Sequence, residues 1–263
     1  MKKSIFMCQR FAFLCFLAGC SSAPPDAEKQ NTVNYLNSIR TQTVNAESGS
    51  FIINTEWNIG GEIETVGRQI DFSHRGSELH YKEAIYDSFA DPSVKPYQTA
   101  ETSEDGTSLI VSSGGDNFTV EVPLDKAPSL EQFFEGVWDT IHSSEIECIE
   151  TAKQGNRTSY TIVYSSDYCK SKGNDTEIGS SVLQSKILEL ELMPDESIKA
   201  VKLNTAGYVS GLDASETPVS QKTELYFKLE YFNAASRKAC WFRLLYNDLR
   251  KGFLFMRLSW PAP

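Results

Sequence analysis

Cys20 is the residue with the clearest chemical role in the sequence. It follows a basic start, which includes Lys2 and Arg10, and an apolar run of about ten residues, half the length that a membrane-spanning helix needs. The two residues before it, Ala18 and Gly19, are small. This order of basic, apolar and small residues is typical of a cleaved secretory signal peptide, so we expect the chain to leave the cytoplasm.

The stretch Leu17-Ala18-Gly19-Cys20 resembles the lipobox of bacterial lipoproteins. The resemblance implies cleavage between Gly19 and Cys20 and a diacylglycerol on the thiol of Cys20. With a second acyl chain, such a lipid anchors a protein firmly to a membrane. Ser21 at the next position favours the outer membrane in a cell that has one. The alternative is an ordinary secretory signal in which the cysteine is incidental.

The rest of the chain lacks a recognisable catalytic or metal-binding pattern. Its histidines, His74, His80 and His142, have no cysteine or second acid at metal-ligand spacing. No metalloprotease or hydrolase motif occurs, and the glycine pairs at 60–61 and 114–115 resemble turns rather than phosphate loops. A catalytic pair of carboxylates can be brought together by the fold from distant positions, so the sequence leaves this one possibility open. We expect no enzyme activity, no cofactor and no metal.

The charge of the chain also limits its partners. Loss of Lys2, Lys3 and Arg10 with the signal peptide leaves 22 basic and 35 acidic side chains, a net charge of −13. We therefore expect no nucleic-acid partner, and we interpret the acidity as solubility at a cell surface.

Three cysteines remain after the signal peptide and the lipid anchor: Cys148, Cys169 and Cys240. An odd number leaves at least one without an intramolecular disulfide. A Cys148–Cys169 bridge is one possibility. However, a hairpin turn at 154–157 would instead place Cys148 opposite Val163.

Apolar periodicity divides the mature chain into elements. Residues 26–44 carry apolar side chains at helical spacing, whereas residues 51–122 alternate with a period of two, which indicates an antiparallel meander with one buried face. Further strands are expected at 145–151, 158–165, 187–193, 198–203 and 223–232, with loops at 170–181 and 211–221. The expected hairpin turns lie at 114–117, 154–157 and 194–197.

A second helix is expected within residues 128–142. Ser129 would be its N-cap and Gln132 would complete a capping box. An apolar stripe at helical spacing follows, and its members are Leu130, Phe133, Phe134, Val137 and Ile141.

This order of lipobox, tether, helix, strands, helix and strands resembles the superfamily of the Lol lipoprotein carriers and their Gram-positive and mycobacterial relatives. The resemblance covers about residues 30–232 and implies an α+β fold, in which a curved antiparallel half-barrel wraps helices on its concave face. It implies four parts: a signal peptide (1–19), Cys20 with a tether (20–30), the carrier-like domain (31–236) and a basic apolar C-terminal segment (237–263).

In that superfamily the cavity between sheet and helices often holds acyl chains. The resemblance therefore implies a non-enzymatic envelope protein that binds a lipid or another apolar ligand there. Aromatic side chains typically line such pockets, and the candidates are Trp57, Phe133, Phe134, Val137 and Trp138. The alternative is that these side chains are ordinary core. The protein would then be a surface interaction or sensory lipoprotein that binds another envelope protein through its acidic face or a sheet edge.

The C-terminal segment departs from the alternating pattern. Between Arg237 and Trp260 it holds six basic residues and one acid, Asp248. It is either a basic amphipathic helix that lies on anionic lipid, a last strand around 253–256, or a segment foreign to the fold.

The lipobox generates the first prediction. In cells fed a labelled fatty acid, Cys20→Ala should abolish both labelling and cleavage, because the acylated thiol is gone. Cys15→Ala is the matched control and should keep the label. A Cys20→Ala chain that still carries it would show that the anchor lies elsewhere.

Overall fold

The computed structural model describes residues 26–75, 78–91, 93–114, 118–125, 128–176, 179–210 and 215–230. Its helices are α1 (Asp26–Val44), α2 (Glu131–Phe134), α3 (Ser166–Ser171) and the 3-10 turn η1 (Ser143–Glu145). Its strands are β1 (Ser48–Ile59), β2 (Glu62–Arg75), β3 (Glu78–Tyr86), β4 (Gln98–Thr102), β5 (Ser108–Ser113), β6 (Thr119–Pro123), β7 (Ile146–Gln154), β8 (Arg157–Tyr164), β9 (Asn174–Thr176), β10 (Gly179–Leu192), β11 (Ile198–Ser210) and β12 (Glu216–Glu230).

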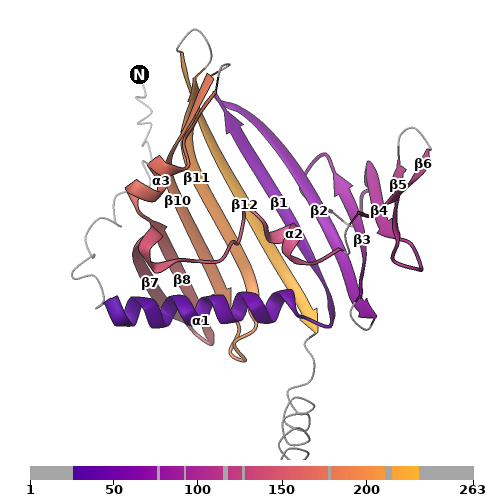
Figure 1. Cartoon of the computed structure of the whole chain (residues 1–263), viewed down its shortest axis with the longest axis horizontal. Helices are drawn as coiled ribbons and strands as arrows, with labels where there is room; N and C mark the ends of the chain where they lie inside the picture. The colour runs from indigo at the N-terminus through magenta and orange to yellow at the C-terminus, as the bar shows by residue number, and fades with distance from the viewer. Residues whose placement is uncertain are drawn as a thin grey trace, which may run out of the picture.

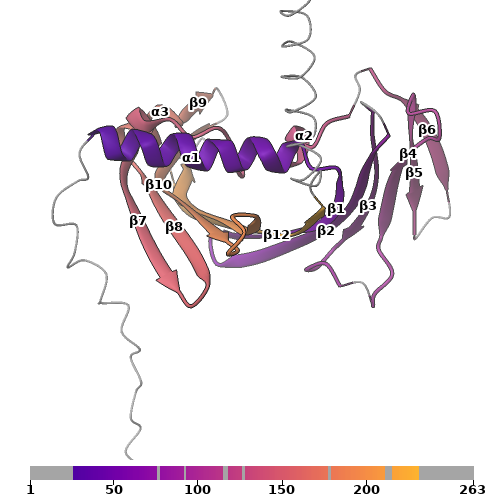
Figure 2. The ribbon, with the colours of Figure 1, turned by 90° about the horizontal axis from the view of Figure 1, so that it is seen from below.

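The strands form one antiparallel sheet in the order β6-β5-β4-β3-β2-β1-β12-β11-β10-β8-β7, with β9 added to β10. Two halves, β1–β6 and β7–β12, meet at the pair β1–β12 in the middle. The sheet curves strongly, and α1 lies across the mouth of the curve (Figures 1 and 2). The predicted α+β half-barrel with helices on its concave face is therefore confirmed.

The concave face of the sheet forms the core. Along β1, Phe51, Ile53 and Thr55 are buried in alternation, as a strand with one covered face requires. Buried side chains of α1 belong to the same core cluster, among them Leu36 and Ile39. At its centre the ring of Phe51 lies 5.6–6.0 Å, centroid to centroid, from four other rings: Phe72, Phe133, Phe134 and Phe227.

The helix predicted within residues 128–142 forms over only one turn, and its predicted length and N-cap are wrong. Only α2 is helical, Leu130 rather than Ser129 occupies its N-cap, and no side chain caps it. The chain leaves the helix at Glu135 and turns at Gly136, whose φ of 77° is left-handed. Residues 128–142, called the strap below, nevertheless bury their apolar stripe.

Polar side chains of α1 hold the strap in place. The Asn37 amide donates to the carbonyl of Ile141 at 2.8 Å and accepts from its N–H at 2.9 Å. Arg40 is itself buried, and its Nε donates to the carbonyl of Trp138 at 2.6 Å. An irregular segment can cover an apolar sheet only if its backbone groups find such partners.

Two predicted loops proved partly extended. Residues 174–176 and those from Gly179 onward form β9 and the start of β10, and β12 begins at Glu216. At the start of β12 no side chain from Glu216 to Lys222 is buried, and the apolar alternation of a core strand is absent there. The turns at 154–157 and 194–197 are confirmed, as is the helix 26–44, which starts inside the range assigned to the tether.

Cys148 lies opposite Val163, as the hairpin register predicts, and no disulfide joins it to Cys169. The signal peptide, Cys20, the turn residues 115–117, Cys240 and the segment 237–263 lie outside the described residues.

The filled core generates a stability prediction. Phe134→Ala should lower the free energy of unfolding by about 3–5 kcal/mol, because it removes a fully buried ring and leaves a cavity. Phe89→Ala, on an exposed ring, is the control and should change it by less than about 0.5 kcal/mol. Urea unfolding measures both. Equal small losses would mean that the core is not packed around the strap.

Candidate functional site

The structure brings four of the five predicted cavity residues together. Phe133, Phe134 and Trp138 are buried, and Val137 packs half-buried against the same core. The rings of Phe134 and Trp138 are 5.9 Å apart, and both lie within 6.1 Å of Phe227. These strap side chains pack against one another and against the concave face of the sheet, so a ligand role for them stays a prediction.

Trp57, the fifth candidate, lies apart from that cluster. It lines an open groove of about 570 Å³ at the far end of the β1–β2 hairpin. The residues around this Trp57 groove are Trp57, Ile63, Glu64, Thr65, Val66, Asp87 and Tyr97.

Three pieces of backbone position the Trp57 groove. The hairpin turns through Gly60 and Gly61, both with left-handed φ, which fixes the register that sets Trp57 opposite Glu64. The pairing of β3 with β2 ends at Gly67, so Asp87 follows the last residue of β3 beside the open part of β2. Tyr97 donates its N–H to the Ile85 carbonyl at 3.0 Å and accepts from the Gly114 N–H at 2.6 Å.

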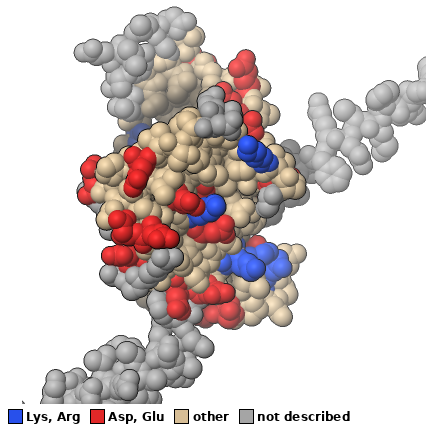
Figure 3. All heavy atoms as spheres, turned by 90° about the vertical axis from the view of Figure 1, so that its right-hand side faces the viewer, with Lys and Arg blue, Asp and Glu red and all other residues tan. Residues whose placement is uncertain are grey.

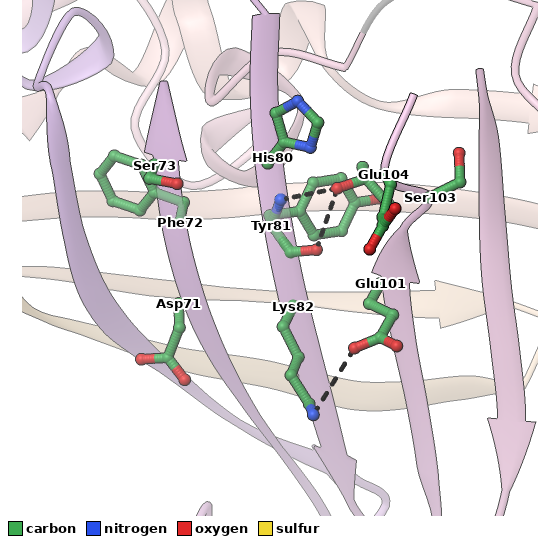
Figure 4. A pocket seen from close by; sticks show the side chains of 10 residues that line it. Asp71, Phe72, Ser73, His80, Tyr81, Lys82, Glu101, Ser103 and Glu104 are labelled. Carbon is green, nitrogen blue, oxygen red and sulfur yellow. Dashed lines mark hydrogen bonds and ion pairs between the residues drawn. The ribbon is translucent and has the colours of Figure 1, made fainter. Parts of the chain in front are cut away.

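A second hollow, of about 330 Å³, lies over β2, β3 and the end of β4 (Figure 4). Lys82 projects there beside Asp71 and pairs with Glu101 at 3.5 Å between Nζ and Oε2. His80 is almost buried and lies 3.9 Å from the exposed carboxylate of Glu78. The one lysine of this hollow is already paired with Glu101, and we assign no ligand to the hollow.

Lys186 on β10 is a buried cation that the sequence analysis missed. Its Nζ donates to the Tyr168 hydroxyl at 3.3 Å and lies 4.7 Å from the centre of the Tyr164 ring. A carboxylate oxygen of Asp139, on the strap, lies 3.9 Å from the same Nζ. The signal was present in the sequence, because Lys186 stands in phase with the buried Leu188 and Leu190.

Burial governs the titration of this cluster. It lowers the pKa of Lys186 below the usual 10.5, and the carboxylates of Asp139 and Glu145 only partly oppose it. Burial also raises the pKa of the Tyr164 hydroxyl and of the Cys169 thiol. A thiol with a raised pKa is a poor nucleophile, so this cluster supports a structural role that ties α3 and the strap to the sheet.

The two outer edges of the sheet differ in character. On β7 the exposed side chains are polar apart from one alanine: Glu147, Glu150, Thr151, Ala152, Lys153 and Gln154. At the other edge, Phe118, Val120 and Val122 are 47%, 46% and 45% exposed. We call these three residues the apolar edge. Val120 and Val122 stand two apart and therefore share one face of β6, and Phe118 directly precedes the strand.

Strand pairing places the apolar edge on the concave face. Residues opposite each other in antiparallel strands point the same way. Following the pairs outward from the core gives one continuous row: Phe51, Ile70, Glu83, Ala100, Val111 and Val120. The sequence pattern predicted β6 as a strand, but not that it ends the sheet.

The surroundings of the apolar edge are acidic. Residues 98–125 contain no lysine or arginine and six acids: Glu101, Glu104, Asp105, Asp116, Glu121 and Asp125. The face of the molecule at this end of the sheet carries several clusters of acidic side chains and fewer basic ones (Figure 3). Hydrogen bonds from Ser103 and Thr107 lower the pKa of Asp105 to about 2, so this carboxylate stays charged.

The described residues hold neither a metal-binding cluster nor a membrane-spanning helix. No group of three or more histidine, cysteine or acidic side chains is arranged to hold a metal ion there. Among the helices of the same residues, none has the length and hydropathy needed to cross a bilayer.

The chain matches no protein-family model and no curated protein. Its structure is similar to a DUF1329 family protein from Desulfovibrio piger, with a TM-score of 0.29 and 10% identity over 77% of this chain and 93% of that one. It is also similar to a putative outer membrane lipoprotein-sorting protein domain from Vibrio parahaemolyticus, with a TM-score of 0.26 and 4% identity over 78% and 94%. At these TM-scores neither likeness carries an argument, and the fold class rests on the strand order itself.

Lys186→Met tests the cost of the buried ammonium. The unfolded chain binds more protons than the folded one between the lowered pKa of Lys186 and 10.5, so the contribution of Lys186 to stability rises with pH in that window. The unfolding free energy of the wild type, relative to Lys186→Met, should therefore increase from pH 7 towards pH 10. Lys153→Met, on the exposed side of β7, should show a difference that does not change with pH. A flat difference for Lys186→Met as well would contradict the burial argument.

Proposed function

We propose that this protein is a non-enzymatic binding module of the cell envelope, held to its membrane by the lipid on Cys20, and that it binds an extended segment of another envelope protein at β6. One observation carries the proposal. Of the two edges of a single open sheet, the β7 edge is polar, whereas β6 exposes Val120 and Val122 and the residue just before it, Phe118, is exposed as well. Exposed apolar edge strands invite pairing, and proteins that gain nothing from it cover or charge them.

Strand addition explains what each face of β6 would contribute. The outward backbone groups of β6 would form the hydrogen bonds of a new antiparallel or parallel pair, which gives affinity with little sequence preference. On the concave side, the apolar edge would extend its row of side chains onto the new strand. On the convex side, the row ends at Glu121, which accepts a hydrogen bond from the Ser108 hydroxyl.

These two faces define the chemistry of the partner. Its strand should alternate apolar side chains, which meet Val120 and Val122, with basic ones, which meet Glu121 and the acids behind it. Complementary charge of this kind steers association and selects among partners more than it adds affinity.

The packed strap favours this interpretation over a lipid in the core. A lipid at the predicted cavity would have to displace Phe133, Phe134 and Trp138, which are all at most 4% exposed. The apolar edge, in contrast, is available without any rearrangement of the described residues.

Site-specific photo-crosslinking in the native cell tests the proposal. A photoreactive residue at Val122 should yield a specific adduct with another envelope protein, whereas one at Ala152 on β7 should not. In the Phe118 crosslinker variant, the double substitution Val120→Lys/Val122→Lys should reduce the adduct at least tenfold, because it places two charges against an apolar strand.

The stability of the double variant is the control for this experiment. Both valines are exposed, so the double substitution should change the unfolding free energy by less than about 1 kcal/mol. Equal adducts at β6 and β7, or an adduct composed only of a second copy of this chain, would contradict the proposal.

A further inference from the structure

We propose that the Trp57 groove binds an organic cation, specifically a quaternary ammonium group. The site lies on the β1–β2 hairpin and the segment before β4, so it is separate from the apolar edge and the inference does not depend on strand addition at β6.

The groove combines two electron-rich rings. Trp57 and Tyr97 both line it, and the faces of such rings attract cations, tryptophan most strongly. The Tyr97 backbone is fixed by hydrogen bonds to two different strands, and Trp57 lies in the regular β1–β2 ladder. The backbone that carries both rings is therefore in place before any ligand arrives, which limits the entropy lost on binding.

The groove also carries negative charge that nothing described neutralises. Glu64 and Asp87 line it, and neither forms an ion pair with any residue that the structure describes. No lysine or arginine is among the lining residues. The second hollow is the useful contrast, because there Lys82 already pairs with Glu101.

Several other carboxylates on this sheet form ion pairs. Glu83 pairs with Arg68, Glu191 with Arg157 and Lys199, and Glu224 with Lys202 and Lys222. The Trp57 groove instead holds two acids that belong to no described ion pair, beside two aromatic rings and with Ile63 and Val66 as apolar neighbours.

A quaternary ammonium group matches this combination. It has a full positive charge, no N–H to satisfy and methyl groups that contact rings and aliphatic side chains. An inorganic cation would need a closer shell of oxygen ligands than two carboxylates at the edge of an open groove supply. The volume of about 570 Å³ also leaves room for the substituent that carries the ammonium.

Calorimetric titration of the full-length lipoprotein in maltoside micelles tests the inference. Choline is the probe, and 3,3-dimethylbutan-1-ol is its neutral isostere. Choline should bind at least tenfold more tightly than the isostere. Trp57→Leu, and separately Glu64→Gln/Asp87→Asn, should each weaken choline binding at least fivefold.

Glu62→Gln is the matched control, because Glu62 lies on the same hairpin but does not line the groove. It should leave choline binding unchanged. All variants are first compared with the wild type by thermal unfolding. If Trp57→Leu does not fold, the indole resonance of Trp57 in the wild-type protein should still shift on adding choline and not on adding the isostere.

The ammonium could belong to a soluble molecule or to a lipid headgroup, and nanodiscs separate the two sources. If nanodiscs of phosphatidylcholine suppress choline binding and nanodiscs of phosphatidylglycerol do not, the ligand is a lipid headgroup. Choline binding that is equal in both identifies a soluble ligand. The inference is overturned if the neutral isostere binds as tightly as choline, if the ring and carboxylate variants bind like the wild type, or if choline does not bind at all.

Discussion

The rest of the structure depends on the hydrogen bonds that α1 makes to the strap. A curved sheet exposes an apolar concave face that must be covered, and here much of the cover has no regular secondary structure. Its carbonyl and N–H groups would be costly to bury unpaired. Asn37 satisfies both backbone groups of Ile141, and Arg40 reaches the carbonyl of Trp138. Two polar residues of one helix thus allow Phe133, Phe134 and Trp138 to fill the core.

The helices and the strap do not cover the two ends of the concave face equally. α1 crosses the mouth of the sheet from the β7/β8 end, where Tyr35 packs on Tyr160, and the strap fills the core around Phe51 of β1, while α3 lies against β10. At the β6 end the concave row continues without them, so Val120 and Val122 remain in contact with solvent. The acidity of this end keeps the exposed apolar strip soluble by repelling further copies of the same surface.

Sequence patterns predicted those elements that are determined by interactions between neighbouring residues. The helix 26–44 and the hairpin that sets Cys148 opposite Val163 followed from periodicity and turn residues alone. The strap did not, because a helical stripe and a buried irregular segment can share one apolar pattern, and the left-handed turn at Gly136 decided between them.

The candidate sites were less accessible to prediction than the elements. Trp57 was chosen for its aromatic ring and does line a groove, but its partners Asp87 and Tyr97 reach it only through the course of the chain after β3. The apolar edge requires knowledge of which strand is last in the sheet. That order follows from the pairing of β1 with β12, and no pattern within either strand reveals it.

The central position of that pair has a consequence for how the chain reaches its native state. β1 and β12 are the first and last described strands in the sequence, and they are neighbours in the sheet. The buried hydrogen bond between Thr55 and Thr223 spans 168 residues of sequence. Phe51 likewise packs on Phe227. The core therefore cannot close until nearly the whole described domain has been synthesised, and contacts this distant form slowly. A chain built in this way stays open while it is being made. Its most vulnerable interval is the time between the emergence of β1 and the arrival of β12.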